Sequence, residues 1–259
     1  MMKPKALILQ AHGTNRDYDV AEALTLAGAD PEGVPLNHLR SGKKCFQDYQ
    51  MLILAGGFSY ADALGAGKLL AVDLNAYFVY EINQFVSAGK PVIGICNGFQ
   101  ALIKSGILPG GETNGKNATL TFNEQGHFEC RWVTLKPVSQ KCIWTKGLDD
   151  PIECPIAHGE GNFQTTEHFH LSSFIKQGQI ALTYIRSDGS PANREYPVNP
   201  NGSIFDIAGI CNPQGNVLGL MPHPENHIYP FQHPNWTRGR NAHSGLVLFQ
   251  NGVKYASNL

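Results

Sequence analysis

The 259-residue sequence predicts an α/β protein whose sheet is mostly parallel and is covered by helices on both faces. Two continuous apolar runs, at residues 51–54 and 91–95, are typical of parallel strands that are buried on both sides. Each run leads into a glycine-containing turn. The segment at residues 69–86, which lies between them, has apolar residues at helical spacing. We therefore expect a strand, a crossover helix and a second, parallel strand.

The rest of the chain extends this pattern. Residues 5–10 form an apolar run, followed by a short polar turn and by helical spacing up to residue 27, which predicts a strand, a turn and a helix. Shorter alternating runs at residues 130–135 and 180–185, bounded by Pro, Gly and Asn, predict further strands of the same domain. Residues 245–253 could form a closing helix. Together the segments indicate one domain spanning residues 1–259.

Composition narrows the function class. The 20 Lys and Arg against 21 Asp and Glu give a formal charge of −1, so the chain lacks the basic character of proteins that bind nucleic acid or anionic membranes. No stretch approaches the roughly 20 apolar residues of a membrane helix, and we expect a cytoplasmic protein. The six cysteines form no C-x-x-C pair, which argues against a metal site.

The segment Gly94-Ile95-Cys96-Asn97-Gly98 has the form of a nucleophile elbow, in which a reactive residue sits at a sharp turn between a strand and a helix. Glycines two positions before and after Cys96 relieve crowding in such a turn. The free N–H groups at a helix N-terminus stabilise a thiolate. Cys96 is therefore the candidate nucleophile for acyl transfer, although a buried structural cysteine packed beside two glycines fits this pattern alone about equally well.

A candidate base follows the later apolar run at residues 217–220. In an extended segment, His223 and Glu225 would point to the same side, and Pro224 would stiffen the spacer between them. Glu225 could then orient His223, which would complete a Cys/His/Glu triad with Cys96. A lone His-Pro-Glu is usually only a turn, so the prediction depends on its combination with the elbow.

Two backbone amides are candidates for an oxyanion hole. The amide of Asn97, directly after Cys96, begins the predicted helix and can donate to a developing negative charge. Gly57, in the glycine pair after the strand at residues 51–54, can bring its N–H close to a ligand because it has no side chain. The sequence therefore predicts a hole formed by Gly57 and Asn97.

Taken together, these elements resemble the class I (triad-type) glutamine amidotransferases, and most closely the glutaminase subunits of phosphoribosylformylglycinamidine synthases. The resemblance rests on three segments in chain order: GGFSY at residues 56–60, PIAHGEG at 155–161 and GLMPHPE at 219–225. It implies a single flavodoxin-like domain. It also implies that Cys96 attacks the side-chain amide of glutamine, that His223 transfers the proton, and that a thioester is hydrolysed to glutamate.

The same resemblance implies the partners. Ammonia would pass to a separate ATP-dependent synthetase subunit of de novo purine biosynthesis, in a complex that includes a small accessory subunit. ATP and Mg²⁺ would belong to that synthetase, and no cofactor is expected in this chain, which lacks a phosphate-binding loop of the Walker type. Glutamine is the expected substrate, and neither nucleic acid nor a membrane is an expected partner.

Other polar residues of these segments carry weaker expectations. Ser59, Tyr60, His158 and Glu160 are candidates for substrate binding or for contact with the synthetase, with a structural role as the alternative. His227 and His233 could suggest a metal site. The prolines around them break any helical ligand spacing, so we expect loop residues and no metal.

Three other functions remain open from the sequence. The chain could serve another synthetase. It could be a cysteine-dependent hydrolase of esters or peptides that uses the same kind of elbow, from which release of ammonia from glutamine would distinguish it. It could also be a non-catalytic interaction module, which labelling of Cys96 by a glutamine-analogue electrophile would exclude.

Overall fold

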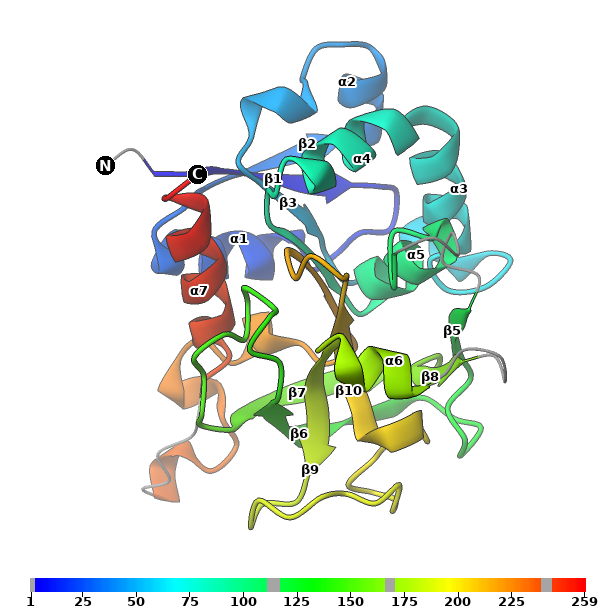
Figure 1. The fold of residues 1–259 in the computed structure, drawn as a ribbon, viewed down its shortest axis with the longest axis vertical. Coiled ribbons are helices and arrows are strands. Elements are labelled where there is room, and N and C mark those ends of the chain that lie inside the picture. The colour runs from blue at the N-terminus through cyan, green and yellow to red at the C-terminus, as the bar shows by residue number, and fades with distance from the viewer. Residues whose placement is uncertain (1–2, 111–116, 166–170, 239–243) are drawn as a thin grey trace.

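The computed structural model describes residues 3–110, 117–165, 171–238 and 244–259. Within these ranges the core is a nine-stranded sheet with the order β2-β1-β3-β4-β11-β10-β9-β6-β7 (Figure 1). Its strands are β1 (Lys5–Gln10), β2 (Asp30–Pro35), β3 (Met51–Leu54), β4 (Val92–Ile95), β6 (Glu129–Pro137), β7 (Ile152–His158), β9 (Ile180–Ile185), β10 (Ile207–Cys211) and β11 (Val217–Leu220).

The first part of this sheet is parallel, as the apolar runs predict. Strand β1 pairs in parallel with β2 and β3, β3 with β4, and β4 with β11. Every residue of β3, β4 and β11 is buried, because helices cover both faces of these strands. The predicted α/β class with helices flanking a parallel sheet is confirmed.

The second part of the sheet is antiparallel. From β11 the sheet continues through β10, β9, β6 and β7, each antiparallel to its neighbour. The predicted strands at residues 130–135 and 180–185 are present as β6 and β9, and both belong to this same sheet. The alternating burial along β6 explains why its sequence reads differently from the buried parallel strands.

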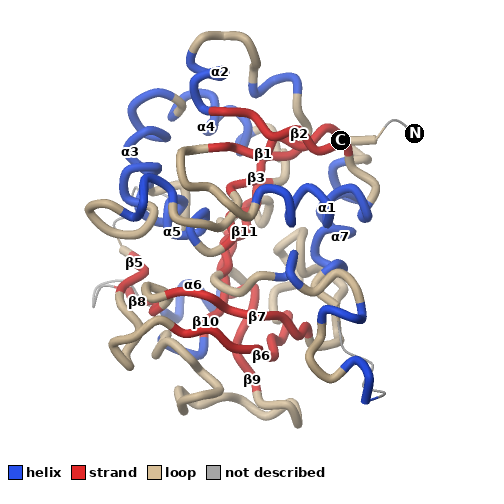
Figure 2. The backbone as a smooth tube through the Cα atoms, turned by 180° about the vertical axis from the view of Figure 1, so that it is seen from behind, coloured by secondary structure: helices blue, strands red, loops and turns tan. Residues whose placement is uncertain are grey.

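Helices cover the parallel part from two sides (Figures 1 and 2). Helix α7 packs against α1 on one side, and α3, α4 and α5 lie on the other. The expected closing helix at residues 245–253 is present as α7. The helices are α1 (Asp17–Ala27), α2 (Leu36–Arg40), α3 (Lys68–Tyr77), α4 (Val79–Ser87), α5 (Asn97–Ser105), α6 (Leu171–Lys176) and α7 (Leu246–Ala256).

Two expectations about local structure were wrong or incomplete. The single helix expected at residues 69–86 is two helices, because Phe78 leaves helical geometry at φ −133° and packs its ring 5.6 Å from that of Phe46. The edge strand β2 was not anticipated. Its Pro31, Gly33 and Pro35 are poor strand formers, and its pairing with β1 over the full length of both strands holds it in place.

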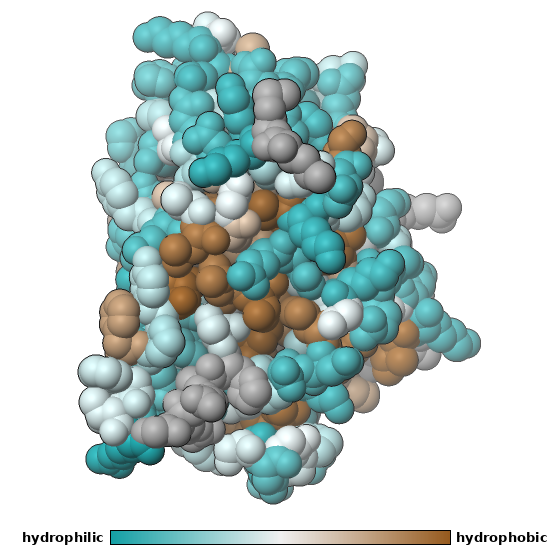
Figure 3. All heavy atoms as spheres, turned by 90° about the vertical axis from the view of Figure 1, so that its left-hand side faces the viewer, coloured by the Kyte–Doolittle hydropathy of each residue, from teal (hydrophilic) through white to brown (hydrophobic). Residues whose placement is uncertain are grey.

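Two smaller features complete the fold. Strands β5 (Ala118–Thr121) and β8 (Asn162–Thr165) form a separate antiparallel pair, and the turn that joins β7 to β8 carries residues 158–161. On the face that carries α1 and α7, apolar side chains gather in the middle and polar ones surround them (Figure 3). Among the described residues, no helix combines the length and the hydropathy needed to cross a membrane.

Candidate functional site

The strand order brings the predicted nucleophile and base together. Strands β4 and β11 are neighbours in parallel register, with Ile95 opposite Leu220. Cys96 follows β4 directly, and His223 lies three residues beyond the end of β11. The Cys96 N–H donates to the Leu220 carbonyl at 2.8 Å, which ties the two strand ends together. Both residues therefore meet at the carboxyl edge of the sheet, where ligands bind in open parallel sheets.

The predicted elbow is present at Cys96. Its backbone adopts φ 50° and ψ −105°, a conformation that non-glycine residues rarely take, and α5 begins at the next residue. A Cβ on Gly98 would lie 2.0 Å from the Leu54 carbonyl oxygen, and one on Gly94 would lie 2.8 Å from that of Gly98. The two glycines are therefore needed because backbones approach closely on both sides of the turn.

His223 and Glu225 form the predicted pair, although by a different local geometry. The Nδ1–H of His223 donates to Oε1 of Glu225 at 2.6 Å, and both side chains are buried. The spacer is not extended, because Pro224–Asn226 form a short 3-10 helix that turns Glu225 back toward His223. Proline suits the first position of such a turn, since the backbone N–H that it lacks would have no partner there in any case.

The charges at the site are coupled. Burial alone would lower the pKa of His223, but electrostatic interactions with Glu225 and Cys96 outweigh it and raise this pKa to about 10. His223 is therefore held as an imidazolium next to Cys96 at neutral pH. An imidazolium next to a cysteine favours the thiolate form of that cysteine and can donate a proton to a leaving group.

The two candidate oxyanion donors lie on segments that the Asn97 side chain joins. Its Oδ1 accepts hydrogen bonds from the N–H of Ser59 at 3.1 Å and from its hydroxyl at 2.5 Å, and its Nδ2 donates to Asp62 at 2.8 Å. Gly57, just before this segment, has φ 136°. Within the described ranges, neither the Gly57 N–H nor the Asn97 N–H has an acceptor. Neither N–H group is therefore engaged by the described part of the chain.

Gly57 gives the first prediction. In Gly57→Ala the new Cβ would lie 2.8 Å from the backbone of both Gly13 and Asn15, so the loop must shift. We expect the hydrolysis of glutamine, the substrate that the sequence resemblance implies, to fall about a hundredfold or more, the effect of losing one oxyanion donor. Gly65→Ala is the matched control, since Gly65 also has positive φ but meets only Lys104 Nζ, at 3.7 Å. Equal losses of steady-state glutaminase rate in both variants would contradict the assignment.

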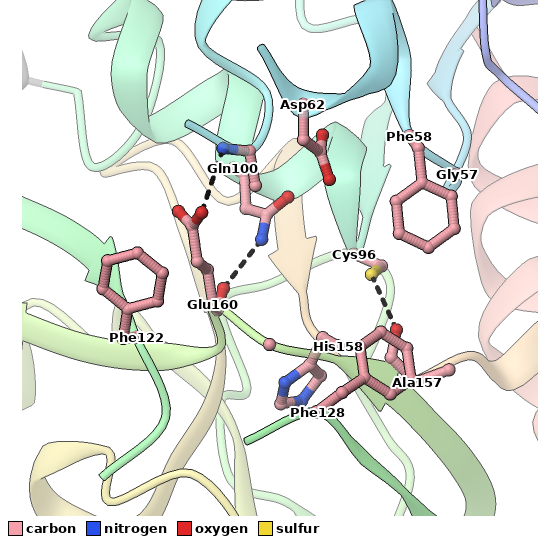
Figure 4. Close-up of a pocket in the computed structure, with 12 residues that line it drawn as sticks. Gly57, Phe58, Asp62, Cys96, Gln100, Phe122, Phe128, Ala157, His158 and Glu160 are labelled. Carbon is pink, nitrogen blue, oxygen red and sulfur yellow. Dashed lines mark hydrogen bonds between the residues drawn. The ribbon is translucent and has the colours of Figure 1, made fainter. Parts of the chain in front are cut away.

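A cavity of about 180 Å³ opens beside Cys96 (Figure 4). The Sγ of Cys96 lies 3.7 Å from the Ala157 carbonyl oxygen at its floor. Three phenylalanine rings that are about half exposed or more line the cavity, and polar groups complete the wall. Its lining residues are Gly57, Phe58, Asp62, Ala66, Cys96, Gln100, Phe122, Phe128, Ala157, His158, Gly159 and Glu160.

Gln100 and Glu160 brace the wall of this cavity. The Nε2 of Gln100 donates to the Glu160 backbone carbonyl at 2.7 Å (Figure 4). The Glu160 carboxylate accepts a hydrogen bond from the Ala66 N–H at 3.2 Å and forms an ion pair with Lys104 at 3.4 Å. The expected residue Glu160 is thus a wall residue whose carboxylate is engaged by the chain itself.

The remaining candidate residues for substrate binding or partner contact lie in different surroundings. His158 lines the cavity, as its motif suggests. Ser59 does not line it and is instead buried against Asn97, and Tyr60 faces a neighbouring cavity, where its hydroxyl bonds Asp73. Burial and this carboxylate raise the pKa of Tyr60 to about 12. Contact of Ser59 or Tyr60 with a synthetase stays a prediction.

His227 and His233 lie behind the triad. They are loop residues, as expected, but both are buried, and both rings pack edge-on against Trp132. His227 bonds the Glu153 carbonyl, and burial lowers its pKa. In the part of the chain that the structure describes, no group of His, Cys, Asp or Glu could hold a metal ion.

Sequence reasoning missed three polar residues of the site. Gln100 could have been found, because it lies one helical turn after Cys96 and so shares its face of α5. Asp62 enters the cavity through the 3-10 turn at Ser59–Asp62, which the sequence did not predict. Asn123 lies in the connection from β5 to β6 and bonds the wall from behind, and no sequence signal indicated it.

Comparison with known proteins shows to which family the chain belongs. Residues 3–256 match the model of the CobB/CobQ-like glutamine amidotransferase domain. The chain belongs to this family. It is 55% identical to the phosphoribosylformylglycinamidine synthase subunit PurQ of Treponema denticola, over 98% of this chain and 99% of the relative. It is 39% identical to the same-named subunit of Methanococcus maripaludis, over 97% of each.

A solved structure agrees with this family. The chain matches one in the structure of PurLQS from Thermotoga maritima with a TM-score of 0.75 and 32% identity, covering 98% of this chain and 99% of that one. The amidotransferase fold therefore extends over the whole length of both chains.

Proposed function

We propose that this glutamine amidotransferase is the glutaminase subunit of a phosphoribosylformylglycinamidine synthase, acting in de novo purine biosynthesis. One observation carries the proposal: a relative that bears this subunit name is 55% identical along essentially its full length. The hydrogen-bonded pair of His223 and Glu225, next to a Cys96 that lines a cavity, supports the chemistry. Residues 1–259 form a single catalytic domain in this proposal.

In the proposed reaction the Cys96 thiolate attacks the side-chain amide carbon of glutamine. The negative charge that develops on the amide oxygen is stabilised by the N–H groups of Gly57 and Asn97. The imidazolium of His223 gives its proton to the nitrogen, the C–N bond breaks, and ammonia leaves behind a thioester. Water, deprotonated by His223, then attacks the thioester and releases glutamate and the thiolate. Glu225 holds His223 in the orientation that this proton transfer needs.

The proposal also assigns the partners. Ammonia passes to the ATP-dependent synthetase subunit, and a small accessory subunit completes the complex, as the solved PurLQS assembly suggests by its name. ATP and Mg²⁺ act on the synthetase, and this chain uses no cofactor of its own. The six cysteines are free thiols, which is consistent with the proposed cytoplasmic location.

The experiment that tests this function compares the chain alone with the chain in complex. We expect the isolated chain to hydrolyse glutamine at least about a hundredfold more slowly than the complex supplied with its substrates, the size of effect that one oxyanion donor produces. The Gly56 carbonyl is held by the Arg16 N–H at 3.3 Å, a long hydrogen bond. Partner docking can therefore re-aim the adjoining Gly57 N–H at low cost.

Glutamine turnover measured with and without the synthetase distinguishes the outcomes. Full activity of the chain alone would refute activation by partner docking, and the glutaminase function would still stand. No ammonia from glutamine under any condition would refute the function itself.

A further inference from the structure

Asn123 lies outside the lining of the glutamine cavity but makes all its side-chain hydrogen bonds to the wall or next to it. It is 2% exposed. Its Nδ2 donates to the carbonyl oxygens of His158 at 2.8 Å and His127 at 3.0 Å, and its Oδ1 accepts the Gly161 N–H at 3.0 Å. Its backbone N–H donates to the Gly159 carbonyl at 2.9 Å. One residue thus clamps the turn at residues 158–161.

These bonds also fix the protonation of His158. Two carbonyl acceptors require the NH₂ group of Asn123 on one side, and the Gly161 N–H requires its oxygen on the other. The Nδ1 of His158, 3.1 Å from that oxygen, must therefore carry a proton and donate it. Burial and the nearby His223 lower the pKa of His158 to about 3, so the ring is neutral at physiological pH.

The neutral ring has an unmet acceptor. Its Nε2 is buried and has no hydrogen-bond donor among the described residues. A buried acceptor without a partner is costly and is normally satisfied by a ligand or a water molecule. The ring packs directly on the backbone of Gly161, where a Cβ would lie 2.2 Å from it, so only glycine leaves room for the ring at this position.

We propose that Asn123 is a positioning residue for glutamine binding, which keeps His158 as the neutral Nδ1–H tautomer and holds the wall at residues 158–161 in place. The proposal rests on the proposed function, since glutamine is the ligand. A neutral His158 adds no second cation beside His223. The clamp also holds His158, Gly159 and Glu160, all of which line the cavity, in the positions from which the wall contacts glutamine.

The kinetic test uses the complex with its synthetase and compares Asn123→Ala and Asn123→Asp with Gln125→Ala. Asp keeps the size and the oxygen acceptor but turns an oxygen toward two carbonyls. Gln125 is exposed in the same turn and serves as the control. We expect both Asn123 variants to raise KM for glutamine about tenfold or more, the effect of roughly one lost hydrogen bond. Ammonia-dependent synthesis and the Gln125→Ala variant should be unchanged, and kcat with glutamine should change far less than KM.

Nitrogen NMR of the wild-type protein labelled at histidine provides a second readout that does not depend on how the variants fold. We expect His158 to carry its proton on Nδ1. A proton on Nε2 would overturn the proposal, and so would an unchanged KM in a folded Asn123 variant. If the wild-type complex itself hydrolyses no glutamine, the proposed function fails, and the tautomer measurement still decides whether Asn123 sets the state of His158.

Discussion

Replacing Cys96 with serine or alanine is expected to abolish glutamine-dependent synthesis by the complex while leaving synthesis from free ammonia intact. The thiolate is the only group that the proposed mechanism uses to attack the amide. Its loss should therefore lower the glutamine-dependent rate by at least about a thousandfold. The synthetase catalyses the second reaction, and it would still accept ammonia from solution. Parallel assays with the two nitrogen donors measure the difference.

A matched control for this experiment is Cys45→Ser, which removes an exposed thiol just before the short 3-10 helix at Phe46–Asp48. Both nitrogen donors should support normal synthesis in this variant. If Cys96→Ser instead lost activity equally with glutamine and with ammonia, Cys96 would be needed for assembly or for the synthetase, and its assignment to glutamine hydrolysis would fail.

His223→Ala should reduce glutaminase activity more than Glu225→Gln does. His223 moves the proton, whereas Glu225 orients it through the 2.6 Å hydrogen bond. In a triad, loss of the base costs roughly two orders of magnitude more than loss of the orienting group. Glutamine can keep an oxygen acceptor for the His223 Nδ1–H, and the second Glu225 oxygen has no partner within the described part of the chain, so the substitution fits the site.

Steady-state glutaminase rates of the two variants in complex, at matched thermal unfolding temperatures, check this order. His38→Ala, in α2 and outside the site, controls for the loss of a histidine as such. A larger defect in Glu225→Gln would mean that the carboxylate does more than orient the base. The charge it supplies to hold His223 protonated would then be the main contribution.

Much of the candidate site could be predicted because its signals are local. The elbow at Cys96 needs glycines at fixed positions. The strand before it and the helix after it are also recognisable from the pattern of consecutive residues. The fully buried parallel strands β3 and β4 read as short apolar runs for the same reason. The pairing of His223 with Glu225 was also within reach, since only one residue separates them, although the turn that joins them was not.

Features that depend on distant segments were decided by tertiary structure alone. The edge strand β2 has an unfavourable composition and exists because β1 offers it a full set of partners. Ser59 and Tyr60 are neighbours in sequence, yet one packs on Asn97 and the other faces a different cavity, because the 3-10 turn directs them apart.

By itself, then, the sequence determined the parallel α/β class, the nucleophile turn and the likeness to triad amidotransferases. Tertiary structure decided which strand ends adjoin, and so that β11 delivers His223 to Cys96. It also decided that Asn123, 35 residues away along the chain from His158, fixes the tautomer of that ring. The physical reason is that strand order and side-chain hydrogen bonds join segments far apart in sequence, whereas composition and spacing report only what neighbouring residues do.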